Sequence, residues 1–251
     1  MTATVSTPNR PGAAPQASRR STHLMPRPRP QAPLRGRGAL LSLAALLSAT
    51  ALLGACADLS RSRDLGNPAV PATTLAQQVC SNCHGLGGTA VSPVFPNLAG
   101  QVEAYTVAQL KGFKGHGRQD PAGFEYMWGL SRSLSDAQID GLASYYAAQV
   151  PVRQPVEAPF ARIAAGQPIF ETGLAEQGVP ACSSCHGDQA QGQAMFPRLA
   201  GQHADYLVKQ LLVFQRTDER PEGSVMKTVA HALTPQNISD VAAYLQALPN
   251  R

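Results

Sequence analysis

The sequence predicts an all-α fold made of two small helical domains in tandem. A short motif occurs twice, as CSNCH at residues 80–84 and as CSSCH at residues 182–186. Beyond each copy, apolar residues recur at helical spacing and at a constant offset of 101 positions, so the repeat extends past the motif. A chain of 251 residues has room for two such domains. The positions that share the offset are Tyr105, Leu110 and Phe113 in one unit and Tyr206, Leu211 and Phe214 in the other.

Residues 1–55 are predicted to be a lipoprotein-type signal peptide with an extended n-region. An apolar run at residues 39–53 is too short and too rich in small residues for a comfortable transmembrane span. It ends in LGAC, which resembles the bacterial lipobox, in which the cysteine is acylated and becomes the N-terminus. Cys56 is also the odd cysteine of five, and acylation would account for a thiol without a partner in an oxidising compartment. An uncleaved anchor, or a signal peptide cut after Ala55 or Ala57, is the alternative.

The positive charge of the whole chain belongs to this leader. Seven of the 21 Lys and Arg residues precede Cys56, whereas all 16 Asp and Glu residues follow it. The remaining chain therefore carries 14 basic and 16 acidic side chains, a formal charge of −2. It contains no basic stripe with interleaved aromatic residues. A nucleic-acid partner is therefore not expected.

Residues 56–73 are predicted to be a tether from the membrane to a first domain at residues 74–150. This stretch contains two prolines, a glycine and several small polar residues, which is typical of a linker. The pattern tightens at Leu75 and Val79, which lie one helical turn apart and lead directly into Cys80. We therefore expect the repeated motif to lie at the end of a helix.

The repeated motif has the spacing of a c-type haem attachment site. Two cysteines three positions apart can form thioethers to the two vinyl groups of one porphyrin, and the next histidine is then placed to ligate the iron. Two such motifs predict two covalently bound c-type haems (heme c, iron). The predicted attachment residues are Cys80, Cys83, Cys182 and Cys185, and the predicted axial ligands are His84 and His186.

One methionine in each unit is predicted to bind the other face of the iron. Met127 lies seven positions before Leu134, and Met226 lies seven positions before Leu233. Both therefore precede the start of a predicted helix by the same distance. A thioether sulfur is an established axial ligand of haem iron.

Other side chains compete with these two methionines. His116 in a glycine-rich turn, His203 at the opening of a helix and His231 after Met226 are each interpreted as solvated or locally hydrogen-bonded. Met195 has no counterpart in the first unit and is interpreted as a packing residue. The methionines at the repeated position are therefore preferred.

The last helix of each unit has clear start signals. Ser135 with Gln138 predicts a capping box, and Thr234 is followed by Pro235 at the first helical position. An apolar stripe follows each start. Its members are Ile139, Leu142, Ala143 and Tyr146 in the first unit and Ile238, Val241, Ala242 and Leu245 in the second.

Residues 151–161 are predicted to be the linker between the units. They contain three prolines and open no helical pattern. The second domain is then expected at residues 162–251, and it opens with a helix over about residues 162–172.

The chain resembles the cytochrome c4 family of diheme cytochromes c over residues 74–249. The resemblance rests on both CxxCHG motifs, on FPNLAGQ at 95–101 and FPRLAGQ at 196–202, and on both methionine spacings. It implies two tandem class I cytochrome c domains whose haems face each other across the domain interface. In such domains the carbonyl of a proline accepts a hydrogen bond from the haem-ligating histidine, and Pro96 and Pro197 match that position. The lipobox departs from the family, many of whose members are soluble or loosely membrane-associated.

These features predict an electron carrier and not an enzyme. With both axial positions of each iron filled, no substrate can bind there, so no catalytic residue is expected and electrons pass by outer-sphere transfer. The favoured hypothesis is a lipid-anchored carrier on the periplasmic side of a bacterial membrane, between a quinol-oxidising complex and a terminal oxidase. A second is the electron-accepting subunit of a periplasmic dehydrogenase. A third, a diheme peroxidase, needs an open iron position, and the two methionines count against it.

Overall fold

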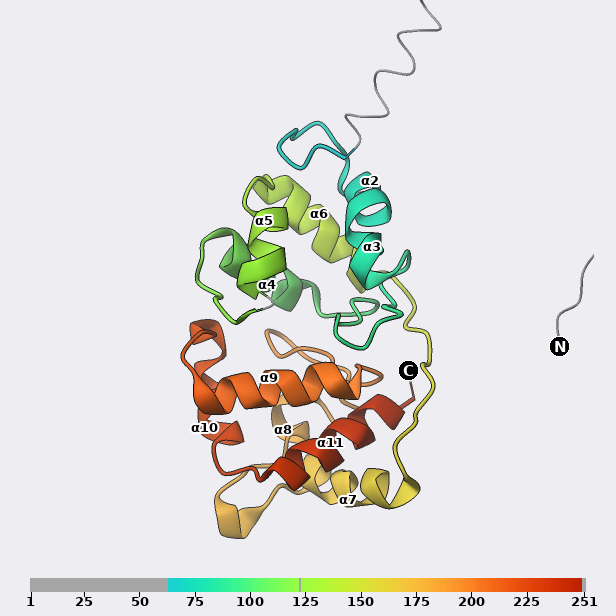
Figure 1. Cartoon of the computed structure of the whole chain (residues 1–251). Helices are drawn as coiled ribbons and strands as arrows, with labels where there is room; N and C mark the ends of the chain where they lie inside the picture. The colour runs from blue at the N-terminus through green and yellow to red at the C-terminus, as the bar shows by residue number, and fades with distance from the viewer. Residues whose placement is uncertain (1–62, 122, 250–251) are drawn as a thin grey trace, which may run out of the picture. The chain divides into compact units, whose positions relative to one another are not determined.

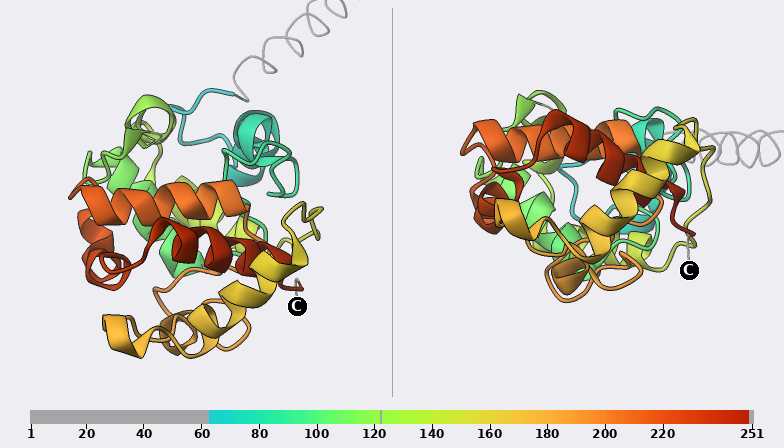
Figure 2. Two further views of the ribbon diagram at one scale, coloured as in Figure 1. Left: turned by 60° about the horizontal axis from the view of Figure 1, so that its bottom comes forward. Right: turned by 90° about the horizontal axis from the view of Figure 1, so that it is seen from below.

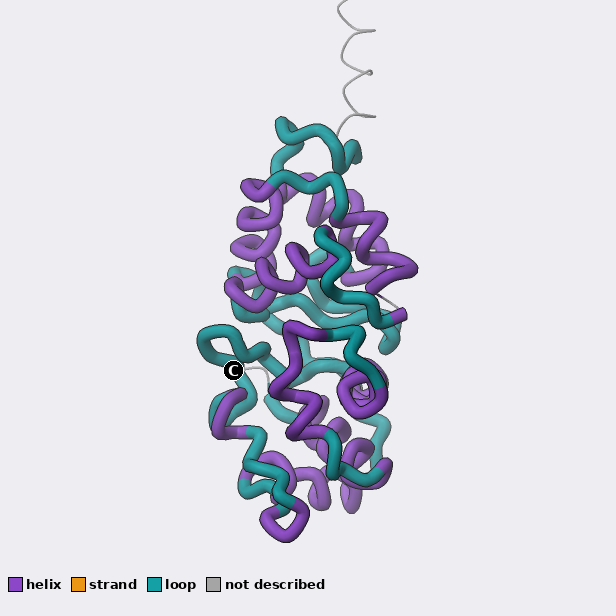
Figure 3. Tube along the Cα trace, turned by 90° about the vertical axis from the view of Figure 1, so that its left-hand side faces the viewer, coloured by secondary structure: helices purple, strands orange, loops and turns teal. Residues whose placement is uncertain are grey.

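The computed structural model describes residues 63–121 and 123–249, all of which belong to one compact unit, Thr50–Arg251. Every regular element in this part of the chain is a helix or a helical turn, accompanied by two isolated β-bridges (Figure 3). The predicted all-α fold is therefore confirmed. The predicted signal peptide, Cys56 and the first part of the tether lie outside the described residues.

The first domain is built from one helical segment that carries the motif and from three later helices (Figure 1). The helix α2 and its neighbour α6 pack together, and α4 packs against both α5 and α6. The motif lies at the end of a helical segment, as predicted. The elements are α2 (Ala72–Leu75), a π-helical turn (Ala76–Cys80), α3 (Ser81–His84), α4 (Glu103–Lys114), a second π-helical turn (Gly123–Met127), α5 (Trp128–Ser131) and α6 (Asp136–Ala147).

The second domain repeats this order of helices. The helix α11 packs against α7 and α9, and two further views show α7 and α11 lying against each other (Figure 2). The helix α7 begins two residues before its predicted start, because Pro159 is its N-cap. The elements are α7 (Phe160–Glu171), a 3₁₀ turn (Ala175–Gln177), α8 (Ser183–His186), α9 (Ala204–Arg216), a 3₁₀ turn (Pro221–Gly223), α10 (Ser224–Ala230) and α11 (Pro235–Ala247).

Each domain has its own apolar core, into which the predicted stripe of its last helix is buried. Such separate cores are expected of two units that each bury one face of every helix. The first core contains Val70, Leu75, Ala76, Leu134, Ile139, Leu142 and Tyr146. The second contains Ile169, Phe170, Val179, Ala190, Ala200, Leu207, Phe214, Ala230, Leu233, Ile238, Val241, Ala242 and Leu245.

Both final helices begin with a reciprocal cap. The Ser135 hydroxyl accepts from the Gln138 backbone N–H at 3.2 Å, and the Gln138 side chain accepts from the Ser135 backbone N–H at 2.9 Å. Thr234 and Asn237 make the same pair of bonds at 3.1 and 3.0 Å. The predicted first capping box is confirmed, and the second was not predicted because asparagine is not one of the usual partners at that position.

In the described part of the chain, no helix combines the length and the apolar character that crossing a membrane would require.

Candidate haem sites

The two motif histidines occupy the same local structure in the two domains. Each is buried, with 8% of His84 and 5% of His186 exposed, and each is followed by a glycine in the left-handed region that ends its short helix. The ring N–H at Nδ1 of His84 donates to the Pro96 carbonyl at 2.9 Å. The same atom of His186 donates to the Pro197 carbonyl at 2.9 Å.

These hydrogen bonds leave Nε2 of each ring as the free lone pair. Burial lowers the pKa of both His84 and His186, and the proline carbonyl offsets only part of this effect because it favours the protonated ring. Both imidazoles are therefore neutral at neutral pH. A neutral imidazole whose second nitrogen is held by a carbonyl is the form in which histidine ligates a metal.

The cysteines of each motif fit the covalent attachment of a haem. None of the four, Cys80, Cys83, Cys182 and Cys185, is in a disulfide, and all are partly exposed. Positions three apart on a helical turn lie on one face, so both thiols of a motif can reach one porphyrin. Burial raises the pKa of the Cys80 and Cys182 thiols to about 11. Two free thiols next to a neutral imidazole are the groups that the attachment of a c-type haem requires.

Two aromatic rings connect the segment that carries Met127 with the first motif histidine. The His84 and Phe95 rings meet edge to face with 6.2 Å between centroids, and Phe95 meets Tyr126 in the same way at 6.4 Å. Tyr126 directly precedes Met127 in a π-helical turn. Such turns are frequent at functional sites.

The second domain places its methionine against the same core as its motif. Met226 lies on α10, and both Met226 and Cys182 pack against the second apolar core. His186 meets Phe196 edge to face at 6.0 Å, which repeats the contact between His84 and Phe95. Both methionines are partly buried. Their role as iron ligands stays a prediction.

The competing side chains fall into different environments. His116 and His231 are exposed, and the ring of His116 lies 4.5 Å from that of Trp128. His203 was wrongly interpreted, since it is 5% exposed and its Nε2 bonds to the carbonyl of Ala90 in the other domain at 2.9 Å. Met195 is 55% exposed, so its interpretation as a packing residue was also wrong.

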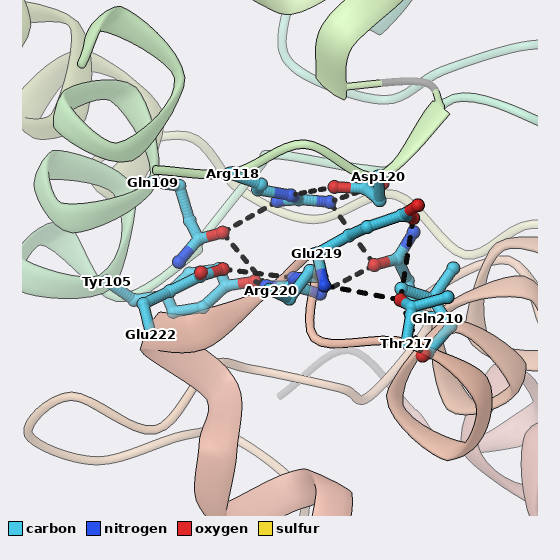
Figure 4. A network of polar contacts seen from close by, with 10 residues as sticks. Tyr105, Gln109, Arg118, Asp120, Gln210, Thr217, Glu219, Arg220 and Glu222 are labelled. Atoms are coloured by element: carbon cyan, nitrogen blue, oxygen red, sulfur yellow. Dashed lines mark hydrogen bonds and ion pairs between the residues drawn. The ribbon is translucent and has the colours of Figure 1, made fainter. Parts of the chain in front are cut away.

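A buried polar network joins the two segments that lead into the methionines (Figure 4). The Gln109 side-chain oxygen accepts from Arg118 at 2.6 Å and from Arg220 at 2.9 Å. The Gln210 side-chain oxygen accepts from Arg118 at 3.2 Å and from Arg220 at 2.5 Å. Two glutamines and two arginines from both domains thus form a closed ring. The network was not predicted, although its members share the repeat offset of 101 or 102 positions.

Asp120 supplies the buried negative charge of this network. It is fully buried and pairs with Arg118 at 2.6 Å. Burial alone would raise the pKa of this carboxyl, but the hydrogen bond and charge of Arg118, with the charge of Arg220, lower it below its usual value. The carboxylate is therefore ionised at neutral pH, and it compensates the charge of a buried guanidinium.

Comparisons with known proteins agree with the haem sites that the motifs and the structure indicate. The cytochrome c family model matches residues 69–147 and 163–249. Cytochrome c-552 of Acidithiobacillus ferridurans is 38% identical over 188 residues, which are 74% of this chain and 81% of that protein. The thiosulfate dehydrogenase electron acceptor of Thiomonas intermedia is 35% identical over 174 residues, which are 68% of this chain and 78% of that protein. The solved cytochrome c4 structure of Acidithiobacillus ferrooxidans has a TM-score of 0.63 at 40% identity, and the match covers 67% of this chain and 98% of that one.

These matches confirm the resemblance that the repeated motifs indicated. The family model covers both motifs, so the two covalently bound c-type haems are confirmed as well. The Thiomonas intermedia relative is an electron acceptor by name, which agrees with the expectation of an electron carrier and not an enzyme. The chain belongs to the cytochrome c family, as a diheme electron carrier of the cytochrome c4 type.

Proposed function

We propose that the protein is a lipid-anchored periplasmic carrier that takes electrons from one redox protein and delivers them to another. His84 and Met127 ligate the iron of the first haem, and His186 and Met226 ligate that of the second. The observation that carries the proposal is the duplicated hydrogen bond from a motif histidine to a proline carbonyl at 2.9 Å. This bond fixes the orientation of each imidazole, and burial keeps the ring neutral, as ligation of iron needs.

The residues of the chain prepare each site for repeated one-electron transfer. A c-type haem supplies the reversible change between ferric and ferrous iron. The cysteine pairs would hold it covalently, and the buried histidine and a methionine thioether would bind the iron and keep substrates away from it. The apolar cores next to Cys80 and Cys182 limit the access of water. Such dry surroundings and a thioether ligand favour a high potential.

Two partner systems fit this carrier. In the first, a quinol-oxidising complex is the donor and a terminal oxidase is the acceptor, as expected above for a carrier that resembles the cytochrome c4 family. The likeness to a thiosulfate dehydrogenase electron acceptor favours a second candidate, in which the protein accepts electrons from a periplasmic dehydrogenase. The membrane anchor in both cases is a lipid on Cys56, the residue that ends the predicted lipobox.

Two measurements test this function. The protein is isolated from native membranes, the co-purifying proteins are identified, and the rate at which each reduces or oxidises the purified cytochrome is measured. We expect rapid reduction by a quinol-oxidising complex or by a dehydrogenase. If the protein co-purifies with no redox protein that exchanges electrons with it, the proposal is contradicted. Cys56→Ser should release the protein from the membrane fraction, and continued membrane association would contradict the lipid anchor.

A further inference from the structure

Two buried glutamines reach across the domain interface in mirrored fashion. Gln101 and Gln202 precede the N-caps of α4 and α9 and are 6% and 5% exposed. The Gln202 side chain accepts from the backbone N–H of Asn97 at 2.8 Å and donates to the carbonyl of Asn97 at 3.0 Å. The Gln101 side chain accepts from the backbone N–H of Arg198 at 2.7 Å and donates to its carbonyl at 3.1 Å. Each glutamine therefore clamps one residue of the other domain by two bonds.

The clamped residue shares a peptide group with the proline that binds the motif histidine. The carbonyl of Pro96 and the N–H of Asn97 belong to one peptide group, whose carbonyl accepts from His84 and whose N–H donates to Gln202. The first haem site is thus connected to the second domain by one continuous chain of hydrogen bonds. In the second domain the chain runs from His186 through the peptide between Pro197 and Arg198 to Gln101.

We propose that each glutamine is a positioning residue that sets the reduction potential of the haem in the opposite domain. The inference rests on the proposed ligation of the irons by His84 and His186. Hydrogen bonds in a chain polarise one another, so a peptide whose N–H finds an acceptor has a more negative carbonyl oxygen. That carbonyl attracts the ring N–H more strongly and makes the imidazole a more basic ligand, which stabilises ferric iron. Gln202 therefore lowers the potential of the first haem, and Gln101 lowers that of the second.

The clamps are pre-organised by the helix that follows each glutamine. The Gln101 side-chain oxygen also accepts from the backbone N–H of Val102 at 2.9 Å, and that of Gln202 accepts from His203 at 3.1 Å. Each amide group is thus fixed by its own domain before it meets the other. Both clamps lie in one interface, so a separation of the domains would break them together and raise both potentials.

The inference predicts that a substitution in one domain shifts the reduction potential of the haem in the other domain. In full-length holoprotein, each haem is followed by its own haem-methyl NMR signals during a redox titration. Gln202→Leu removes both bonds to Asn97 at nearly constant volume. We expect it to raise the potential of the first haem and to leave that of the second unchanged. Gln101→Leu should do the reverse.

A second substitution separates the electronic role from simple packing. A protonated carboxyl group can accept and donate as the amide does, so Gln202→Glu should leave the potential of the first haem near that of the wild type at low pH. Once that carboxyl ionises, the added charge should lower this potential. Gln210→Leu is the matched control, because Gln210 joins the domains without touching a histidine-binding peptide.

The possible outcomes are distinct. No shift in Gln202→Leu, a shift of the haem in its own domain, or a shift equal to that in Gln210→Leu would overturn the inference. If Gln202→Leu does not fold, Gln202→Glu provides the test. The absence of a pH-dependent shift in the potential of the first haem in that variant would also overturn the inference. Failure of the proposed ligation by the histidines would appear elsewhere, as unchanged haem spectra in His84→Ala and His186→Ala.

Discussion

The motif histidines are in surroundings that favour metal binding before any haem is considered. Burial lowers the pKa of His84 and His186, so no proton competes with iron for Nε2 at neutral pH. The proline carbonyls fix the rings and strengthen the basicity of the free nitrogen. The chemistry of each site therefore depends on one backbone carbonyl, which lies in the loop after the motif.

Replacing an axial methionine should change one haem and spare the other. In Met127→His and Met226→His, we expect the sulfur-to-ferric-iron absorption band of that domain to disappear. The potential should fall by a substantial part of the roughly 0.8 V over which axial ligands move haem potentials. Spectroelectrochemical titration of each variant measures both effects. Met195→Leu is the control, because Met195 is 55% exposed and lies outside the repeated position. An unchanged spectrum in either variant would point to another ligand.

At the scale of the elements, the helices that follow the methionine segments begin at strong local signals. The hydroxyl of Ser135 satisfies a backbone donor at the start of α6. Ser135→Ala should therefore lower the free energy of unfolding by about 1 kcal/mol. Denaturant unfolding of the holoprotein measures this loss. The exposed Ser144 in the middle of the same helix provides the control, and Ser144→Ala should be neutral or slightly stabilising. Equal effects in both variants would exclude a role for the cap.

The contact between α7 and α11 depends on the lack of a side chain at Gly166. A Cβ at this position would lie 2.1 Å from the carbonyl oxygen of Asp240, so the two helices would have to move apart. Gly166→Ala should destabilise the protein by about 1–3 kcal/mol, even though alanine is the better helix former. In Gly129→Ala nothing lies within 4 Å of the added carbon, so the same exchange should be neutral or stabilising by up to about 1 kcal/mol. Equal thermal unfolding midpoints would contradict this view of the helix contact.

Local signals predicted most elements, whereas contacts between the domains escaped prediction. The cap at Ser135 and the helical segment that carries Cys80 depend on neighbouring residues, so their sequence patterns were sufficient. His203 and Arg118 were different, because their burial arises from chain segments about a hundred positions away. A polar side chain in a buried interface has the same local pattern as one in solvent. The repeat offset was the one available hint, since matching polar residues on two copies can meet across a pseudo-symmetric contact.

At the scale of the whole molecule, the interface between the domains is held by polar groups on two sides. One side joins the peptides that bind the motif histidines, and the other joins the segments that precede the methionines. Both axial faces of each proposed haem site are thus supported from the opposite domain.

The buried pair of Asp120 and Arg118 should make the stability of the assembly depend on pH. Asp120→Asn leaves the guanidinium without its counter-charge, so the free energy of unfolding at neutral pH should fall by about 2–3 kcal/mol. The pKa of Asp120 is lower in the folded protein than the value of about 3.9 expected in the unfolded chain. The unfolded state therefore binds the proton first. The contribution of Asp120 is complete above the unfolded pKa and is lost as the pH falls through the folded pKa.

Denaturant titrations of the holoprotein from neutral pH downward measure this difference. The gap in stability between wild type and Asp120→Asn should be constant above about pH 5 and should shrink below about pH 4. Asp218→Asn is the matched control, because Asp218 is 85% exposed and pairs with Lys227 at the surface. It should cost at most about 1 kcal/mol. A gap that stays constant through acid pH would mean that Asp120 acts by shape and hydrogen bonding alone. In that case its negative charge does not stabilise the contact between the domains.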